Sequence, residues 1–271
     1  MLRKLAYLLS LLMVVALVSC GGKKEEEADD EGGEEGGETA AATLLKADMA
    51  NGATINGTIT LDGTAPAAKQ IKMDADPVCK SAHSTPQMDD FWMVGAEGGV
   101  ANAFVYVKDG LGGKEYEPLT AEVTLDQKGC MYYPRVAGVT VGASVKIHNS
   151  DQTLHNIHSF AEKNGQFNEG QPAGAPASVK KEEFSKPEIM IPIKCDVHGW
   201  MKTYVGVLSH PFFAVTGPDG KFEIKGLPAG EYTLAVWHES SKGTPAGVTS
   251  EMKVTVAAKE AKTADMKVKP E

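Results

Sequence analysis

The amino-acid sequence predicts an all-β protein. Three observations lead to this prediction. Many short segments alternate apolar and polar residues, with the period of two that half-buried strands show. Clusters of Gly, Pro, Asn and Asp separate these segments and are typical of turns. Beyond the N-terminal segment, no stretch has the apolar period of an amphipathic helix.

The strands are expected along most of the chain. Thr54–Leu61 alternates clearly and ends at a turn, Asp62-Gly63. Residues 65–92 have several Pro, Asp and Ser and are expected to form a long loop, as are residues 161–177, which are rich in Gly, Asn, Gln and Pro. Further strands are predicted over residues 100–108, 121–125, 136–140, 144–148, 188–194 and 204–207.

The N-terminal 50 residues are expected to stand apart from the fold. Residues 1–19 resemble a lipoprotein signal peptide, because Arg3 and Lys4 precede an apolar run that ends in a lipobox, Leu-Val-Ser-Cys-Gly. In that pattern Cys20 is lipidated and becomes the first residue of the mature protein; an ordinary signal peptide is the alternative. Residues 20–50 include nine acids between Glu25 and Glu38 and predict a disordered tether.

The charge of the chain bears on its partners. The formal net charge is −9, and much of the acidic excess lies in the tether. The remainder has no basic stripe, so no nucleic-acid partner is expected. The predicted partner is a membrane, held through the lipid on Cys20. The predicted location is the bacterial cell envelope, on its periplasmic or extracellular face.

One short segment carries metal-ligand chemistry. Cys195, His198 and Met201 lie in IPIKCDVHGWMKTYVGV with two residues between each pair. A thiolate, an imidazole and a thioether on one loop are the ligand types of a mononuclear copper centre, which also needs a second imidazole. Upstream, VKIHNSDQTLHNIHSF offers His155. His158 is the competitor, but strand alternation puts it on the opposite face from His155.

These two segments resemble the cupredoxins, the small blue copper proteins, and the loop spacing is closest to the amicyanin type. The resemblance covers roughly residues 115–210. It rests on the Cys195–His198–Met201 loop and the strand after it, and on one set of upstream residues: Val145, Asn149, Asp151, His155 and Asn156. It implies a Greek-key β-sandwich holding one type 1 copper ion.

The resemblance also implies a role for each residue. Cys195 would give copper its short covalent bond, His198 would bind it at the protein surface, and Met201 would be the weak axial ligand. Asn156 would stabilise the loop by a side-chain hydrogen bond. Trp200 lies between two ligands and would cover the metal, contact a partner or simply pack.

The C-terminal part resembles a second family. Residues 211–239 contain TGPDGKFEIKGLPAGEYTL, which is similar to the carboxypeptidase regulatory-like, or transthyretin-like, β-sandwich. Last strands are expected over residues 252–256 and 262–268. The first strands of such a sandwich lie before the copper segment, so we expect residues 51–113 and 211–271 to form it and residues 114–210 to be an inserted cupredoxin domain. Two separate consecutive domains are the alternative.

Two other cysteines remain, Cys79 and Cys130. In an oxidising compartment they would form a disulfide that closes a long loop. Alternatively they stay free thiols, or Cys79 and His83 belong to a second metal site.

The preferred function is a lipid-anchored type 1 copper protein that carries single electrons between redox partners. No His-x-His pair, phosphate loop, Ser-His-Asp order or paired catalytic carboxylates stand out, so the chain is not expected to be an enzyme. The alternatives are a copper storage or delivery protein and a non-redox envelope binding module.

Overall fold

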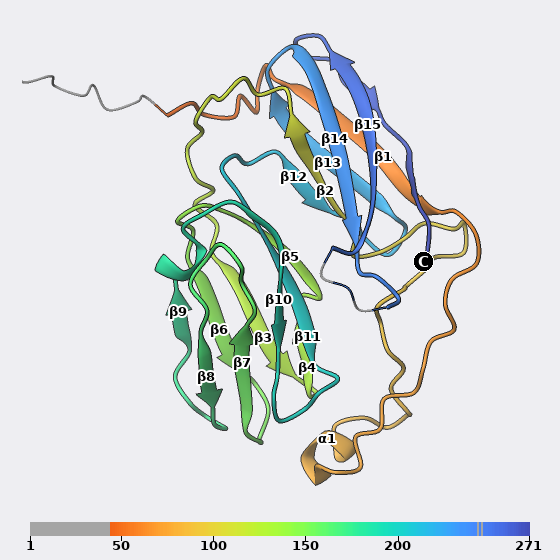
Figure 1. Ribbon diagram of the computed structural model, residues 1–271, viewed down its shortest axis with the longest axis vertical. Helices are drawn as coiled ribbons and strands as arrows, with labels where there is room; N and C mark the ends of the chain where they lie inside the picture. Colours follow the sequence, from red (N-terminus) through yellow and green to blue (C-terminus); the bar gives the residue numbers. More distant parts are fainter. Residues whose placement is uncertain (1–43, 243, 245) are drawn as a thin grey trace, which may run out of the picture. The chain divides into compact units, whose positions relative to one another are not determined.

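The computed structural model describes residues 44–242, 244 and 246–271. These residues form four β-sheets, and the prediction of an all-β protein is confirmed (Figure 1). The predicted signal peptide, Cys20 and most of the tether lie outside the described residues. Within the described part of the chain, no helix is both long and apolar enough to cross a membrane.

Strands from both ends of the described chain build one lobe, which we call the split lobe. One of its sheets has the order β13-β1-β16, with β17 also paired to β1, and the other has the order β12-β2-β14-β15. Apolar side chains such as Ile55, Val105 and Leu234 are buried between these sheets and make the lobe a β-sandwich. Its strands are β1 Ala53–Leu61, β2 Phe104–Asp109, β12 Phe213–Val215, β13 Lys221–Leu227, β14 Gly230–His238, β15 Val248–Val256, β16 Ala261–Thr263 and β17 Met266–Val268.

The strands between β2 and β12 build a second sandwich, the central lobe. Its sheets have the orders β5-β11-β10-β7-β8 and β4-β3-β6-β9. Leu125, Ile157 and Val205 lie in the apolar core between them. The elements are β3 Val123–Lys128, β4 Met131–Tyr133, β5 Val136–Thr140, β6 Val145–Asn149, β7 His155–Ser159, β8 Asn168–Gln171, β9 Ser178–Lys180, the 3-10 helix η1 Glu182–Phe184, β10 Glu188–Lys194 and β11 Lys202–Leu208.

A pair of glycines seats the split lobe on the central lobe. Gly138 of β5 lies opposite Gly206 of β11. A Cβ atom on these glycines would lie 2.7 and 2.8 Å from ring carbons of Phe104, which packs there with Met190. The absence of side chains at Gly138 and Gly206 therefore makes room for the Phe104 ring, which a larger residue at either position would displace.

Both predicted loops contain regular structure. Residues 161–177 include β8, a polar edge strand paired with β7, which lacks the alternation that the prediction required. Residues 65–92 include the short helix α1 Pro77–Ser81. Asp76 caps its start by accepting hydrogen bonds from the N–H groups of Val78 and Cys79 at 2.8 and 3.3 Å. Five residues are too few to show a helical period.

The helix belongs to a closed loop, residues 69–89, which we call the cap segment. Its base is closed by backbone hydrogen bonds of 2.8 Å from Ile71 to Gln87 and from Asp89 to Lys69. Met73 and Cys79 join the core of the central lobe, although these residues precede it in sequence. Figure 1 shows α1 near the lower end of the central lobe, where β10 turns into β11.

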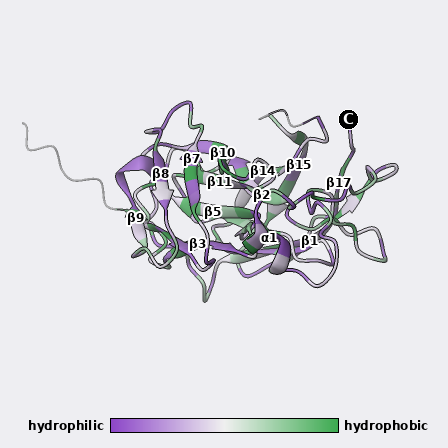
Figure 2. Cartoon of the chain, turned by 90° about the horizontal axis from the view of Figure 1, so that it is seen from below, coloured by the Kyte–Doolittle hydropathy of each residue, from purple (hydrophilic) through white to green (hydrophobic). Residues whose placement is uncertain are grey.

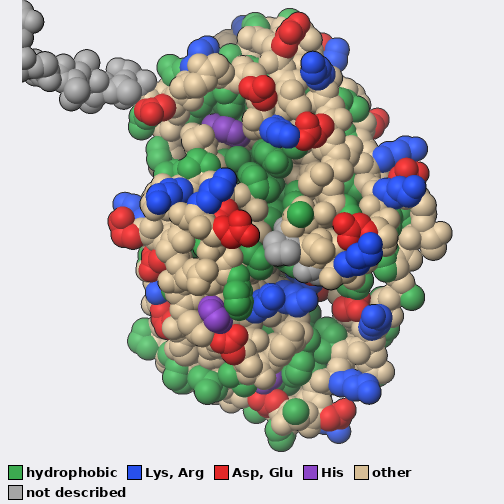
Figure 3. Space-filling view, viewed as in Figure 1, with side chains coloured by type: hydrophobic (Ala, Val, Ile, Leu, Met, Phe, Trp, Pro, Cys, Tyr) green, Lys and Arg blue, Asp and Glu red, His purple; other side chains and the backbone are tan. Residues whose placement is uncertain are grey.

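Hydrophobic and charged residues are distributed differently over the described chain. Hydrophobic residues lie mainly on the strands in Figure 2. Figure 3 shows acidic and basic side chains interspersed on the face drawn, without a large area of one sign.

Candidate metal centre

Strand pairing brings the two candidate segments together. β7 and β10 are antiparallel neighbours, with Ser159 opposite Ile193 and His158 opposite Lys194. The start of β7 and the end of β10 therefore meet at one edge of the sheet. His155 is the first residue of β7 and Cys195 directly follows β10. Residues separated by 40 positions in sequence are neighbours in the fold for this reason.

Three of the predicted ligands converge. The ligand atoms of His155, Cys195 and His198 all lie within 4.8 Å of one another. The two Nδ1 atoms are 2.9 Å apart, and the Cys195 sulfur is 3.8 Å from Nδ1 of His198. The three residues are only 0, 2 and 3% exposed. This is a compact set of two nitrogens and one sulfur, shielded from solvent.

The orientation of each imidazole is fixed from behind. Nε2 of His155 lies 2.9 Å from a carboxylate oxygen of Asp151, and Nε2 of His198 lies 3.1 Å from one of Asp76. A carboxylate accepts, so each Nε2 carries a proton, and the two Nδ1 atoms face each other. Two ring nitrogens at 2.9 Å need a positive charge between them, which is either a second proton on His155 or a bound cation in its place. The donor set therefore fits a soft-to-borderline cation such as copper.

The electrostatics of the site favour the thiolate. Burial raises the pKa of the Cys195 thiol, but the hydrogen bond with His155 and backbone N–H groups outweigh it, and the pKa is lowered. One of these donors is the His198 N–H, 3.3 Å from the sulfur. Burial lowers the pKa of His155, yet Asp151 and the thiolate raise it to about 9. In His198 burial prevails over Asp76 and the pKa is lowered.

Met201 closes the turn that holds two of the ligands. Its N–H donates to the His198 carbonyl at 2.9 Å, and its carbonyl accepts from the Cys195 N–H at 3.2 Å. The residue is fully buried and packs in the same core as Cys195. The backbone thus brings Met201 beside the three converging residues, while coordination by its thioether stays a prediction.

Asn156 ties the two segments to each other. Its side-chain oxygen accepts from the Asp196 N–H at 2.6 Å, and its amide donates to Asn168 and Asp196 at 2.7 and 3.1 Å. The side chain bridges β7 to the loop after β10, as the expected role requires. On the other side, Asn149 accepts from the Asp151 N–H at 2.9 Å and shapes the turn before His155.

The cap segment covers His198, which contradicts the expectation that this histidine lies at the surface. Cys79 and Cys130 form a disulfide, and the Cys79 sulfur is 3.5 Å from Nε2 of His198. Trp200 packs with its ring centroid 5.1 Å from that of His198 and donates to the Cys130 carbonyl at 2.9 Å. The surface expectation was wrong because the cover comes from a distant part of the sequence.

The other histidines lie apart from this set. His158 points to the opposite side of β7 and contacts Asp196 at 3.0 Å. His83 contacts the Gly129 carbonyl at 2.6 Å, and its suggested partner Cys79 is held in the disulfide. A second metal site built on Cys79 and His83 is thereby ruled out in the disulfide-bonded protein.

Comparison with known proteins gives partial likenesses of fold. No protein-family model matches the chain, and no curated protein matches it. A copper-containing nitrite reductase from Thermus scotoductus SA-01 is 23% identical over 36% of this chain, with a TM-score of 0.29. A purple cupredoxin from Nitrosopumilus maritimus is 21% identical over 32% of this chain and 98% of its own, with a TM-score of 0.27.

An amicyanin mutant in its reduced Cu(I) form is 21% identical over 34% of this chain and 91% of its own, with a TM-score of 0.25. This chain spans 24% of the nitrite reductase chain. TM-scores this low carry no information on the chemistry of the site, which must be argued from the residues of this chain.

Proposed function

We propose that the protein binds one copper ion through His155, Cys195, His198 and Met201 and carries single electrons between redox partners. The observation that carries the proposal is the convergence of two imidazole nitrogens and a cysteine sulfur in one buried place. Copper bound there would supply a one-electron couple between its two oxidation states.

The surroundings of the ligands suit electron carriage. The Cys195–Met201 turn is closed by backbone hydrogen bonds at 2.9 and 3.2 Å, and Asn156 fastens it to β7. Ligands that are fixed in this way move little when the charge of the ion changes. The ligand side chains are almost fully buried, so an electron can reach the ion where a substrate molecule cannot. This favours a carrier over an enzyme.

The proposed location rests on the N-terminal sequence and on the disulfide. The lipobox around Cys20 predicts a lipid anchor, and the acidic tether would let the folded part reach a partner away from the membrane. A disulfide between Cys79 and Cys130 suits the oxidising space outside the cytoplasm. Both observations support a location in the bacterial envelope as part of the proposal.

Copper titration of the purified full-length chain tests the proposal. One equivalent of Cu(II) is expected to produce an intense visible thiolate-to-copper charge-transfer band. Cys195→Ser should abolish the band, while His148→Gln should retain it because His148 contacts Asp126 and Ser150, outside the ligand set. A colourless parent protein that binds no copper would refute the proposal.

Copper storage or delivery is the second candidate. Asp76 and Cys79 cover His198, and this favours storage or delivery. A covered site would retain its ion, and the cover would separate the His198 imidazole from a redox partner. Voltammetry separates the two functions. A reversible one-electron wave supports the carrier, whereas tightly held copper without such a wave supports storage.

A further inference from the structure

We propose that Asp76 is the positioning residue of His198, and that the Cys79–Cys130 disulfide keeps its carboxylate in place. The inference rests on the proposed copper site and adds to it a residue 122 positions away in sequence. Sequence spacing gives no hint of this contact, and the cap segment that supplies it lies outside the central lobe's own strands.

The Asp76 carboxylate is held from three directions. Oδ2 lies 3.1 Å from Nε2 of His198 and accepts from the Thr153 hydroxyl at 2.8 Å. Oδ1 accepts from the Val78 N–H at 2.8 Å and from the Cys79 N–H at 3.3 Å. These bonds leave the carboxylate little freedom to turn away from the imidazole. Helix α1, the turn before β7 and the loop that carries His198 therefore meet at the Asp76 side chain.

The carboxylate faces His198 as an acceptor. It already accepts from the Thr153 hydroxyl and from two backbone N–H groups, and an unprotonated oxygen 3.1 Å from Nε2 of His198 accepts the ring proton as well. A fixed negative charge behind a ligand imidazole has two consequences. It keeps the proton on Nε2, so that Nδ1 faces the ion, and it favours the more positive oxidation state of a bound metal.

The disulfide joins the supports of both histidines. On one side, Cys79 donates its N–H to Asp76, which contacts His198. On the other side, Cys130 donates its N–H at 2.7 Å to Asp151, which contacts His155. The bond between the two sulfurs thus connects the backbone segments that hold the two orienting carboxylates. It fixes the distance between the cap segment and the central lobe at the point where the ligands need it.

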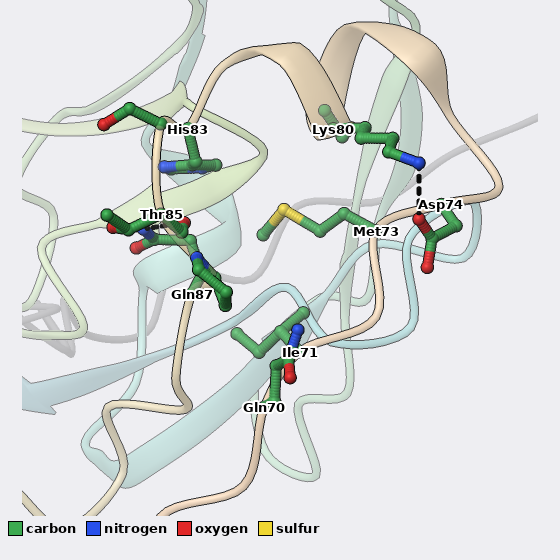
Figure 4. A pocket seen from close by; sticks show the side chains of 11 residues that line it. Gln70, Ile71, Met73, Asp74, Lys80, His83, Thr85 and Gln87 are labelled. Carbon is green, nitrogen blue, oxygen red and sulfur yellow. Dashed lines mark hydrogen bonds and ion pairs between the residues drawn. The ribbon is translucent and has the colours of Figure 1, made fainter.

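Few other contacts hold this part of the cap segment. Met73 is buried against the central lobe, and His83 contacts the Gly129 carbonyl. Figure 4 shows Met73 between the two arms of the segment and, on its outer side, an ion pair of Asp74 with Lys80. Both partners of that pair are largely exposed and contribute little to anchoring. The disulfide links residues 51 positions apart and is the covalent tie between the cap segment and the central lobe.

The first experiment needs no copper. In the copper-free full-length protein, nitrogen NMR of the His198 ring is expected to show the Nε2–H tautomer. Asp76→Ser should shift the ring toward the Nδ1–H tautomer, because serine still caps the helix but offers the imidazole no charge. Asp74→Asn is the matched control, since it removes one carboxylate from the same segment away from the ring, and it should leave the tautomer unchanged.

The second experiment measures the midpoint potential of the copper-loaded protein. Asp76→Ser and Asp76→Asn should shift it to more positive values, on the order of 59 mV for each tenfold loss of preference for Cu(II). Asp74→Asn should not. Cys79→Ser/Cys130→Ser should shift the potential in the same direction, and adding Asp76→Asn to it should produce little further change, because the carboxylate has already been released.

The outcomes separate this inference from the function on which it rests. If the parent binds copper but Asp76→Ser keeps both the parent tautomer and the parent potential, Asp76 only caps α1 and the inference fails. If the parent binds no copper, the proposed function fails, while the tautomer of His198 still decides the role of Asp76.

Discussion

The two lobes are both β-sandwiches, but they bury different kinds of side chain. The interior of the split lobe is a single apolar cluster of residues such as Ile55, Val107 and Leu234. Most of the buried polar side chains among the described residues belong to the central lobe. Several of them, including Asn149, His155 and Asn156, gather where β6 and β10 end and β7 begins.

The buried polar groups of the central lobe are satisfied by hydrogen bonds that converge on one place. A buried polar group destabilises a core unless it is hydrogen-bonded. In the central lobe this condition is met by a set of hydrogen bonds in which Asp76, Asp151 and Asn156 each contact a candidate ligand or its loop. The split lobe carries no such set among its described residues.

The largest effect is expected where the lobes are joined. Arg135 is buried and contacts Glu239 at 3.1 Å and Asp90 at 2.8 Å. Arg135→Met leaves these carboxylates without their cationic partner and should lower the free energy of unfolding by about 3–5 kcal/mol. Urea denaturation followed by tryptophan fluorescence measures the loss. Adding Glu239→Gln should restore part of the stability; a double variant no more stable than the single one would contradict this account.

A matched pair of leucine substitutions compares the two cores directly. Leu234 in β14 and Leu125 in β3 are both fully buried. Replacing either by alanine should cost about 2–5 kcal/mol of unfolding free energy. Leu234→Ala should leave the copper charge-transfer band unchanged, because the split lobe supplies no ligand. A shifted band in this variant, with copper still bound, would show that the split lobe shapes the site.

Some parts of the candidate site could be predicted from the sequence, and others could not. The spacing of Cys195, His198 and Met201 is local, so the sequence alone identified the loop, and strand alternation separated His155 from His158. The cover over His198 comes from Asp76 and Cys79, and no local pattern connects these residues to it. An Asp-Pro pair at the start of α1 was the available signal for a helix cap.

The fold shows the same limit. Apolar alternation identified most strands of the two cores, because those strands bury one face. The edge strand β8 has the sequence Asn-Glu-Gly-Gln and is held by pairing with β7, so composition suggested a loop. The glycines Gly138 and Gly206 become meaningful only when β5 and β11 are known to pair. Partners distant in sequence decide these features, and a single sequence does not reveal them.

A pH titration compares buried histidines in different surroundings. His155 has a carboxylate partner, and its pKa is raised to about 9, whereas burial lowers the pKa of His210 from 6.5 to about 4. Below pH 6.5 the unfolded chain gains a proton at His210 that the folded chain refuses, so stability falls as the pH drops from 6.5 to 4.

The shift at His210 corresponds to a loss of about 3 kcal/mol. His210→Gln should remove this part of the pH dependence, and urea denaturation at a series of pH values measures it. The same slope between pH 6.5 and 4 in the parent and the variant would exclude His210 as its source.

The smallest effect in stability, and the most specific for the site, is expected at Asn156. Asn156→Ala removes the acceptor of the Asp196 N–H and should cost about 1–3 kcal/mol. The copper band should also broaden, because the loop after β10 loses its tie to β7. Asn164→Ala is the matched control: this amide contacts Lys186 and Glu188 at 2.8 and 2.9 Å in the same lobe, away from the ligands. It should cost a comparable free energy and leave the band as it is. If both variants broaden the band equally, general loosening of the central lobe explains the change, and Asn156 has no special role at the metal centre.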